Sequence, residues 1–356
     1  MIRERQPIRG LVAGLALLAA LAAGTAAASC EAESTRVNIQ RLQGNPIVHP
    51  GMDARMGSNV QGPSLIRVPD WINDPLGRYY LYFADHKGDY IRLAYANQLE
   101  GPWKVHPPGS LRLDQSHFRT EAAAVPADFE VTPQMRVEGV KGVPIPIDSF
   151  TKPHIASPDV HVRDDRREIV MYFHGLEDFR FQRTRAATSV DGLHFEAREP
   201  LIGRSYLRAF LHDGKWYALG MPGEFYRSDD GISDFEVGPT LFPRTMRHAG
   251  LLKRDDTLFV FWSNVGDEPE HIVLSTIDIS ADWSGWSASE PRSVLEPETD
   301  WEGADRPLVA SVRDAINVRV NQLRDPAIYQ EDGRIYLLYA IAGEAGIAIA
   351  ELTIDC

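Results

Sequence analysis

The chain contains five apolar segments that could form β-strands. Charged and imidazole side chains occur near the ends of these segments and of the shorter strands that precede them. The groups at these positions are Asp85, His86, His154, Asp159, His174, Arg208, Arg247, His248, Arg324, Asp325 and Glu344. Carboxylates and imidazoles transfer protons, and all of these groups form hydrogen bonds with hydroxyls. A site that gathers them would suit a hydroxyl-rich ligand and proton transfer at a glycosidic oxygen.

The elements that must position these groups are five aromatic-rich strands. They span residues 79–86, 169–174, 216–220, 258–264 and 335–340. Each follows a shorter strand and a polar turn, such as Asp332-Gly333, which is the turn chemistry of a β-hairpin. A third strand follows each hairpin, and helical periodicity is scarce. One unit repeated five times predicts an all-β fold, a five-bladed β-propeller.

The propeller geometry predicts where the polar groups meet. The first strand of each blade lies innermost and the second runs antiparallel to it, so the start of the first and the end of the second reach the same face. We therefore expect one axial pocket, surrounded by Asp85, His86, Asp159, His174, Arg208, His248, Asp325 and Glu344.

The spacing of the blades predicts one domain, residues 30–356. First strands begin near residues 62, 157, 206, 248 and 325, so two gaps fit a bare blade and two carry insertions, near 105–153 and 287–322. We expect these insertions to be loops over one face. The segment 45–48 is expected to supply an outer strand that closes the ring.

The first 29 residues have the pattern of a secretory signal peptide, with a basic start, an uncharged apolar run and Ala26-Ala27-Ala28 as the cleavage site. We therefore expect an exported, periplasmic or extracellular protein, with membrane attachment only through a lipid on Cys30. Cys30 and Cys356 could instead pair across the chain ends. The net charge of −13 argues against nucleic acid as a partner, and we expect a monomer that binds carbohydrate.

The strand starts resemble those of the five-bladed glycosidase superfamily, that of the family 43 arabinanases and xylosidases. The resemblance runs from about residue 45 to the end, and its carriers are Gly62-Pro63-Ser64-Leu65, Ser157-Pro158-Asp159-Val160 and Arg324-Asp325-Pro326-Ala327. It implies a general base in blade one, a pKa-tuning Asp in blade two and a general acid Glu in blade three. Asp159 matches blade two, but Gly62 stands at the base position and blade three has Tyr206-Leu207-Arg208 without an acid.

The missing acids leave several catalytic assignments open. Asp325 or Glu302 is the expected base, with Asp159, another acid or a histidine such as His174 as its partner. His86, His154, Arg208, Arg247, His248, Arg324, Asp85 and Glu344 are the expected substrate-binding groups. The resemblance implies no required cofactor and allows an axial calcium ion.

Three functions remain open at this point. The leading hypothesis is an exported glycoside hydrolase that inverts configuration. The second is a polysaccharide lyase, in which His and Tyr abstract a proton beside a uronate that Arg208, Arg247 and Arg324 neutralise. The third is a propeller that binds glycans without cleaving them, which Gly62 favours and the density of acids and histidines opposes.

Overall fold

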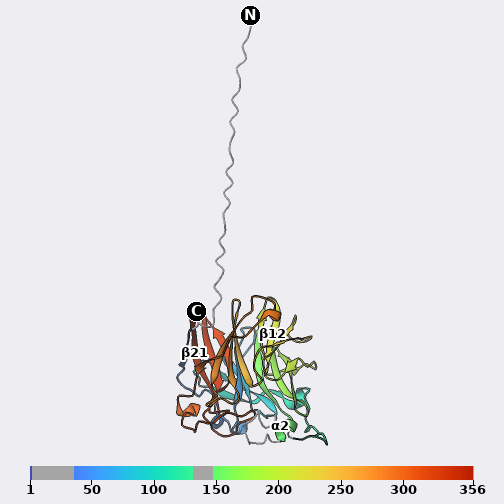
Figure 1. Ribbon diagram of the computed structural model, residues 1–356, viewed down its shortest axis with the longest axis vertical. Coiled ribbons are helices and arrows are strands. Elements are labelled where there is room, and N and C mark those ends of the chain that lie inside the picture. The colour runs from blue at the N-terminus through green and yellow to red at the C-terminus, as the bar shows by residue number, and fades with distance from the viewer. Residues whose placement is uncertain (2–35, 131–146, 356) are drawn as a thin grey trace.

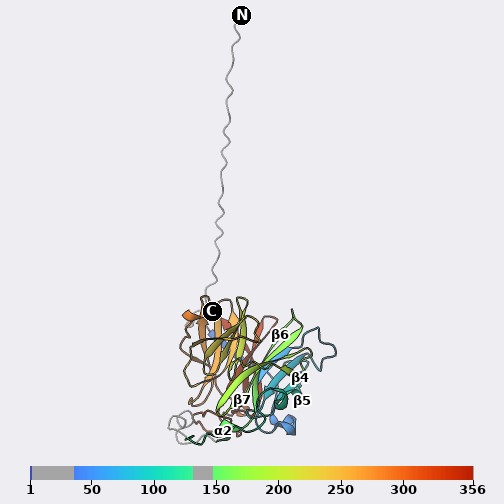
Figure 2. The ribbon, with the colours of Figure 1, turned by 90° about the vertical axis from the view of Figure 1, so that its right-hand side faces the viewer.

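The computed structural model describes Met1 and residues 36–130 and 147–355. Five antiparallel sheets form the blades of a β-propeller (Figures 1 and 2). The predicted all-β fold with five blades is confirmed. The expected signal peptide, the lipid on Cys30 and the Cys30–Cys356 pair lie outside the described residues.

In blades 1 and 2 the strands follow one another from the axis outward. Blade 2 differs by having two short strands at its outer edge. The strands are β2 (Gln61–Arg67), β3 (Tyr79–Ala84), β4 (Tyr90–Ala96) and β5 (Lys104–Arg112) in blade 1, and β6 (Ile155–Arg163), β7 (Glu168–Asp178), β8 (Phe181–Ser189), β9 (Glu196–Ala197) and β10 (Gly203–Arg204) in blade 2.

Blades 3 and 4 repeat this order, and blade 5 takes its outer strand from the start of the chain. The strands are β11 (Arg208–His212), β12 (Lys215–Gly220), β13 (Glu224–Ser228) and β14 (Glu236–Thr240) in blade 3; β15 (Met246–Arg254), β16 (Thr257–Asn264), β17 (Ile272–Asp278) and β18 (Arg292–Leu295) in blade 4; and β19 (Arg324–Glu331), β20 (Arg334–Ala340), β21 (Ile347–Asp355) and β1 (Arg36–Arg41) in blade 5.

The described helical segments are single turns between strands. They are η1 (Pro50–Met52), η2 (Ala54–Met56), η3 (Leu113–Gln115), α2 (Asp148–Thr151), η4 (Trp283–Gly285) and η5 (Asp300–Glu302). No helix of the described residues is long and apolar enough to cross a membrane.

The hydrophobic core is divided among the interfaces between neighbouring blades. Strand β3 contributes to two of them, because Leu81 and Phe83 pack against blade 5 whereas Tyr80 and Tyr82 pack against blade 2. Both faces of the strand are therefore buried. This explains why the second strands are apolar runs rather than alternating ones.

The ring is closed by β1, which pairs antiparallel with β21 from Arg36 opposite Asp355 to Arg41 opposite Ala350. The prediction that residues 45–48 close the ring is wrong, because Val48 makes only an isolated bridge to Ile347. Strand β1 alternates between apolar and polar residues, and its apolar ones pack on the core between blades 4 and 5.

The first insertion begins later than predicted. Residues 104–112, which fall partly within the expected insertion near 105–153, form the outer strand β5 because Val105 and Leu111 reach the cores on either side of blade 1. The connection that leaves the blade starts after η3. In the second predicted insertion, 287–322, β18 comes first and η5 lies in the loop that follows.

The two ends of the propeller differ. Helix α2 and the beginning of β6 lie at one end, at the bottom of Figures 1 and 2, whereas β21 ends at the other. We call the first end, at which the inner strands β2, β6, β11, β15 and β19 begin, the start face, and the other end the opposite face.

Inner strands begin with a shared irregularity that positions residues at the start face. In β2, Gln61 and Ser64 are paired with β3 but the two residues between them are not, and β6, β15 and β19 show the same shift. In β2, β6 and β19 the first of the two unpaired residues has a positive φ; these residues are Gly62 (65°), Ser157 (49°) and Asp325 (50°). Tyr206 (57°) occupies the same place before β11. These four residues are therefore equivalent around the axis.

Candidate active site

A cavity of about 560 Å³ opens at the start face, a size typical of ligand sites. Its wall includes α2 and the turn between β7 and β8. The charged, imidazole and phenol side chains that line it are His86, Lys87, Arg180, Arg183, Arg204, Tyr206, Glu224, Arg244, Arg247, His248, Arg313 and Asp314. Three of the predicted groups, His86, Arg247 and His248, are among them.

A hydrogen-bonded chain runs from this cavity into the protein. The Tyr206 hydroxyl lies 3.1 Å from His86 Nε2, and His86 Nδ1 lies 3.1 Å from Glu344 Oε1. An ionised carboxylate only accepts, so Nδ1 carries the imidazole proton, Nε2 is left as an acceptor, and the Tyr206 hydroxyl donates to it. Phenol, imidazole and carboxylate thus stand in the order by which enzymes activate a hydroxyl group.

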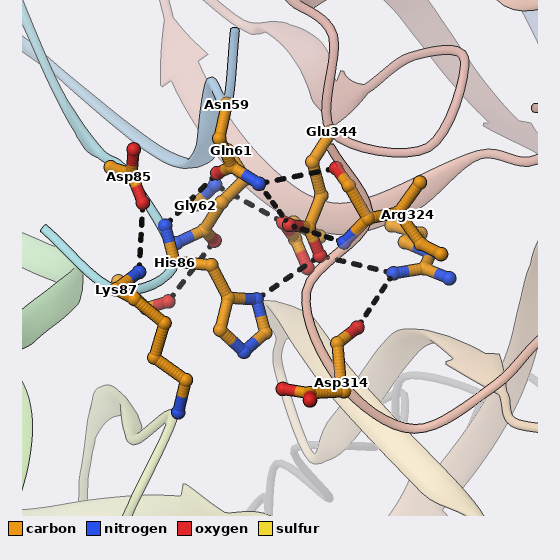
Figure 3. A network of polar contacts seen from close by, with 12 residues as sticks. Asn59, Gln61, Gly62, Asp85, His86, Lys87, Asp314, Arg324 and Glu344 are labelled. Carbon is orange, nitrogen blue, oxygen red and sulfur yellow. Dashed lines mark hydrogen bonds and ion pairs between the residues drawn. The ribbon is translucent and has the colours of Figure 1, made fainter. Parts of the chain in front are cut away.

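Glu344, the buried end of this chain, is held by several donors (Figure 3). Asn59 Nδ2 donates to it at 2.6 Å and Arg324 Nη1 at 3.0 Å. Burial alone would raise the pKa of Glu344, but the His86 imidazole and the Arg324 guanidinium hold that pKa well below its usual range. The carboxylate is therefore ionised and fixes the orientation of His86.

Two more imidazoles pack against the Tyr206 ring, with centroid distances of 4.1 Å for His174 and 3.8 Å for His248. Burial lowers the pKa of both histidines well below the usual range. Burial, with the nearby charge of Glu344, raises the pKa of Tyr206. A protonated phenol is therefore surrounded by neutral rings, with His86 as its hydrogen-bond acceptor.

Arg208 lies among the inner strands, further from the start face than Tyr206. It borders a second cavity, of about 630 Å³, at the opposite face. Its guanidinium donates to the carbonyl oxygens of Ala249 at 2.9 Å, Pro158 at 2.8 Å and Pro63 at 3.2 Å, and so ties three inner strands together. The structure therefore places Arg208 in the lining of the second cavity and not in that of the cavity that His86 lines.

Asp159 borders the same second cavity. It accepts hydrogen bonds from His161 Nε2 at 2.7 Å and from the Ala209 backbone at 2.8 Å. Burial would raise the pKa of Asp159, but His161 and Arg208 hold it below its usual range. Ser157, not Asp159, is the blade-two residue equivalent to Gly62, and Asp159 lies two residues further toward the opposite face. The expectation of one pocket for Asp159 and His86 is therefore wrong.

Glu302 lies in the lining of neither cavity. Its carboxylate accepts from Arg41 Nε at 2.8 Å and from the Tyr339 hydroxyl at 2.9 Å, and it caps η5 through Thr299. This fully buried side chain joins β1 and β20 to the loop between blades 4 and 5. The structure thus places the expected base away from the cavity.

Asp325 and Arg324 are buried behind the cavity lining. Asp325 Oδ2 accepts from the Gly62 backbone at 3.2 Å, and its other oxygen contacts His248 Nδ1. Arg324 bridges Glu270 at 3.3 Å and Glu344 at 3.0 Å. Both support residues that do line the cavity. Arg247 lines it while pairing with Glu270 at 2.9 Å.

Asp85 and His154 also lie outside the cavity lining. Asp85 accepts from the backbone of Lys87 at 2.8 Å, and His154 Nδ1 lies 2.7 Å from the carbonyl oxygen of Lys152. Burial lowers the pKa of His154 well below its usual range. These two residues shape the segments beside the cavity rather than its surface.

Tyr206 is a candidate functional residue that the sequence-based predictions did not assign to the site. It occupies the position in blade three at which the resemblance implies an acid. Because Tyr206 is not a carboxylate, the comparison with the resembling family did not assign it a role. The signal that could have found it is its position one residue ahead of Leu207-Arg208, in register with Gly62 and Asp325.

Within residues 36–130 and 147–355, no group of three or more His, Cys, Asp or Glu side chains could hold a metal ion. The allowed axial calcium ion therefore stays a prediction.

Solved structures share this architecture. They include a glycosyl hydrolase from Bacteroides ovatus (12% identity, TM-score 0.56, 88% of this chain and 93% of that one) and an endo-1,4-β-xylanase from Bacteroides thetaiotaomicron (12%, 0.52, 84% and 95%). A family 43 β-xylosidase/α-arabinofuranosidase from a compost metagenome, solved with xylotriose, matches at 14% identity and a TM-score of 0.50, over 89% and 95%. The protein has the five-bladed propeller fold of the family 43 glycoside hydrolases.

One curated protein gives a relationship at the level of sequence. The chain is 33% identical over 356 residues to an uncharacterized protein of Acanthamoeba polyphaga mimivirus, covering 91% of this chain and 93% of that protein. The chain belongs to the same family as that protein. No model of a known protein family matches it.

Proposed function

We propose that the protein is a glycoside hydrolase whose active site is the start-face cavity and whose reacting group is Tyr206. The observation that carries this proposal is the chain of hydrogen bonds from Tyr206 through His86 to Glu344. The fold, shared with known glycoside hydrolases, supports carbohydrate as the ligand. The predicted leader supports a site of action outside the cytoplasm.

The proposed reaction uses Tyr206 as a nucleophile. Its oxygen attacks the anomeric carbon while His86 Nε2 takes the phenol proton, and the glycosidic oxygen departs from the opposite face of the sugar with a proton from a carboxylic acid of the lining, Glu224 or Asp314. The resulting carboxylate then takes a proton from the water that attacks the glycosyl-tyrosine, and His86 returns its proton to the Tyr206 oxygen. Glu344 stabilises the imidazolium in both steps. Two displacements at one carbon retain its configuration.

The sequence-based hypothesis of inversion needs a carboxylate base and a carboxylic acid across the cavity. Glu224 and Asp314 are the carboxylates in its lining, and Glu224 already accepts from Arg204 Nε at 3.2 Å and from the Tyr226 hydroxyl. An inverted product would contradict the role of Tyr206 as nucleophile and would assign the chemistry to these two acids.

A lyase remains the second candidate because Tyr206 is hydrogen-bonded to an imidazole in a cavity lined by arginines. In that reaction the Tyr206 oxygen would remove the proton beside a uronate carboxylate, and the product would carry a double bond. The third hypothesis, binding without cleavage, predicts no product at all.

The test is product analysis on a polysaccharide panel with the wild type and two variants. We expect new reducing ends from the wild type, a loss of at least about a hundredfold in Tyr206→Phe, and normal activity in Tyr329→Phe, which removes a phenol at the opposite face. Absorbance of an unsaturated uronate would favour the lyase. Equal activity of Tyr206→Phe and wild type would contradict the proposal.

A further inference from the structure

The start-face cavity is basic although the chain as a whole is acidic. Seven lysines and arginines but only two carboxylates are among its lining residues, whereas the chain carries a net charge of −13. The cations come from blades 1, 2 and 4 and from the segments that flank blade 4. This concentration of positive charge raises the local concentration of anionic ligands.

Two of these cations, Arg180 and Arg183, have no carboxylate partner in the described part of the chain. Arg180 lies 5.3 Å from the ring centre of Phe150, and Arg183 lies 5.4 Å from that of Phe181 and donates to a backbone oxygen. Aromatic rings orient a guanidinium without neutralising it, so its N–H groups stay available for an anion.

Lys87 repeats this pattern on the neighbouring blade. Its ammonium donates to the Ser149 carbonyl oxygen at 3.3 Å and forms no ion pair with any described residue. Among the described residues, the cavity therefore presents cations from two blades that form no ion pair. By contrast, Arg204 and Arg247 are paired with Glu224 at 3.2 Å and Glu270 at 2.9 Å.

We propose that the substrate is an acidic glycan, whose carboxylate or sulfate groups pair with Lys87, Arg180 and Arg183 at the rim of the cavity. This inference rests on the proposed function only for the assumption that the ligand is a glycan. Arginine recognises the oxygens of either anion with paired N–H donors.

An anionic substrate also gives a physical reason for the group at the reacting position. A carboxylate nucleophile would repel a sugar that carries its own negative charge, whereas a protonated phenol would not. Gly62, Ser157 and Tyr206, at equivalent places in blades 1 to 3, put no negative charge beside the axis. Asp325 is the carboxylate of this ring, and it is buried against His248.

The proposal is tested by calorimetric binding with the full chain carrying Tyr206→Phe, so that cleavage does not interfere. Oligogalacturonate is compared with its methyl ester, which has the same sugars without charge, and a carrageenan oligosaccharide tests sulfate without carboxylate. We expect at least one acidic ligand to bind at least about tenfold more tightly than the methyl ester. Added salt should reduce that difference.

Charge-removing substitutions locate the contact. Arg183→Gln and Lys87→Gln should each weaken acidic-glycan binding at least about fivefold, whereas Arg166→Gln, an exposed cation on the β6–β7 turn, should not. Equal binding of the acid and its methyl ester, binding of neither acid, or unchanged affinity in both rim variants would overturn the inference. Charge-selective binding without cleavage by the wild type would contradict only the proposed function, and cleavage without charge selectivity would contradict only this inference.

Discussion

At the scale of single residues, the site depends on the charge states of a few buried groups around Tyr206. His174 and His248 are neutral, Glu344 is ionised, and these states are set by burial and by the neighbours that each group has. Of the three histidines beside the Tyr206 ring, His86 is the one hydrogen-bonded to the Tyr206 hydroxyl, so His86 is its proton acceptor. The first two predictions belong to this scale.

Glu344→Gln is expected to lower kcat about ten- to a hundredfold with little change in KM. The substitution removes the charge that orients His86 and stabilises its imidazolium, so the pH profile of kcat should also shift. Glu302→Gln is the matched control, because Glu302 is equally buried and paired with Arg41 but lies outside the cavity. It should cost stability and leave kcat near that of the wild type; a larger loss of kcat there than in Glu344→Gln would reverse our assignment.

Stability should fall as the pH drops below about 6.5, the pKa of histidine in an unfolded chain. Burial lowers the pKa of His154, His174 and His248 in the folded protein, so the unfolded state takes up protons first. Each such histidine adds about 1.4 kcal/mol per pH unit to the slope.

Urea unfolding between pH 7 and pH 5 measures this slope. His174→Gln should make it shallower, and His117→Asn, which changes an exposed histidine, should leave it unchanged. A slope that does not respond to His174→Gln would show that this ring is not held neutral.

At the scale of elements, the bulge that opens the inner strands decides which side chains the start face can carry. In β2 this position requires glycine, because a Cβ on Gly62 would lie 2.9 Å from Ser157 Cα. Ser157 and Tyr206 occupy the same place in blades 2 and 3 without such a conflict.

Gly62→Asp is therefore expected to lower stability by about 2 kcal/mol or more and not to raise activity, although it restores the acid that the resemblance implies. Gly214→Asp provides the control, since Gly214 also has positive φ but has open space around its Cβ position. Thermal unfolding and glycan cleavage are measured for both. Increased hydrolysis by Gly62→Asp would indicate a carboxylate base in blade 1 and would contradict our use of Tyr206.

The sequence predicts the elements well because each hairpin is specified locally, by an apolar run and a polar turn. It does not predict which cavity a residue faces. Asp159 and Ser157 are two residues apart, and although Ser157 precedes a proline as Gly62 and Asp325 do, it is the unpaired residues of the bulge that show their shared place at the start face. The sequence does not predict the role of Tyr206, because the resemblance implies a carboxylate at this position. The proposed role of the phenol depends on its contact with His86, which lies 120 residues away in the chain.

At the scale of the whole molecule, the fold depends on one long-range pairing. Strand β1 covers β21, whose Ile347, Ile349 and Leu352 belong to the cores on both sides of blade 5. A chain beginning at residue 42 should expose β21 as an unpaired edge and lose about 10 °C or more in unfolding temperature, or aggregate. A chain beginning at residue 30 is the control, and equal unfolding temperatures of the two would contradict this account of ring closure.

The pairing of β1 with β21 also sets an order of events during biosynthesis. The strand made first has its partner in the strand made last, so it must wait roughly 15 to 60 s at ordinary rates of translation before that partner exists. Blades 1 to 4 can form in sequence on a growing chain, but blade 5 cannot be completed before the C-terminal strand has been released. The chain therefore remains an open array of blades, with the edge of blade 1 not yet covered by a completed blade 5, throughout its synthesis.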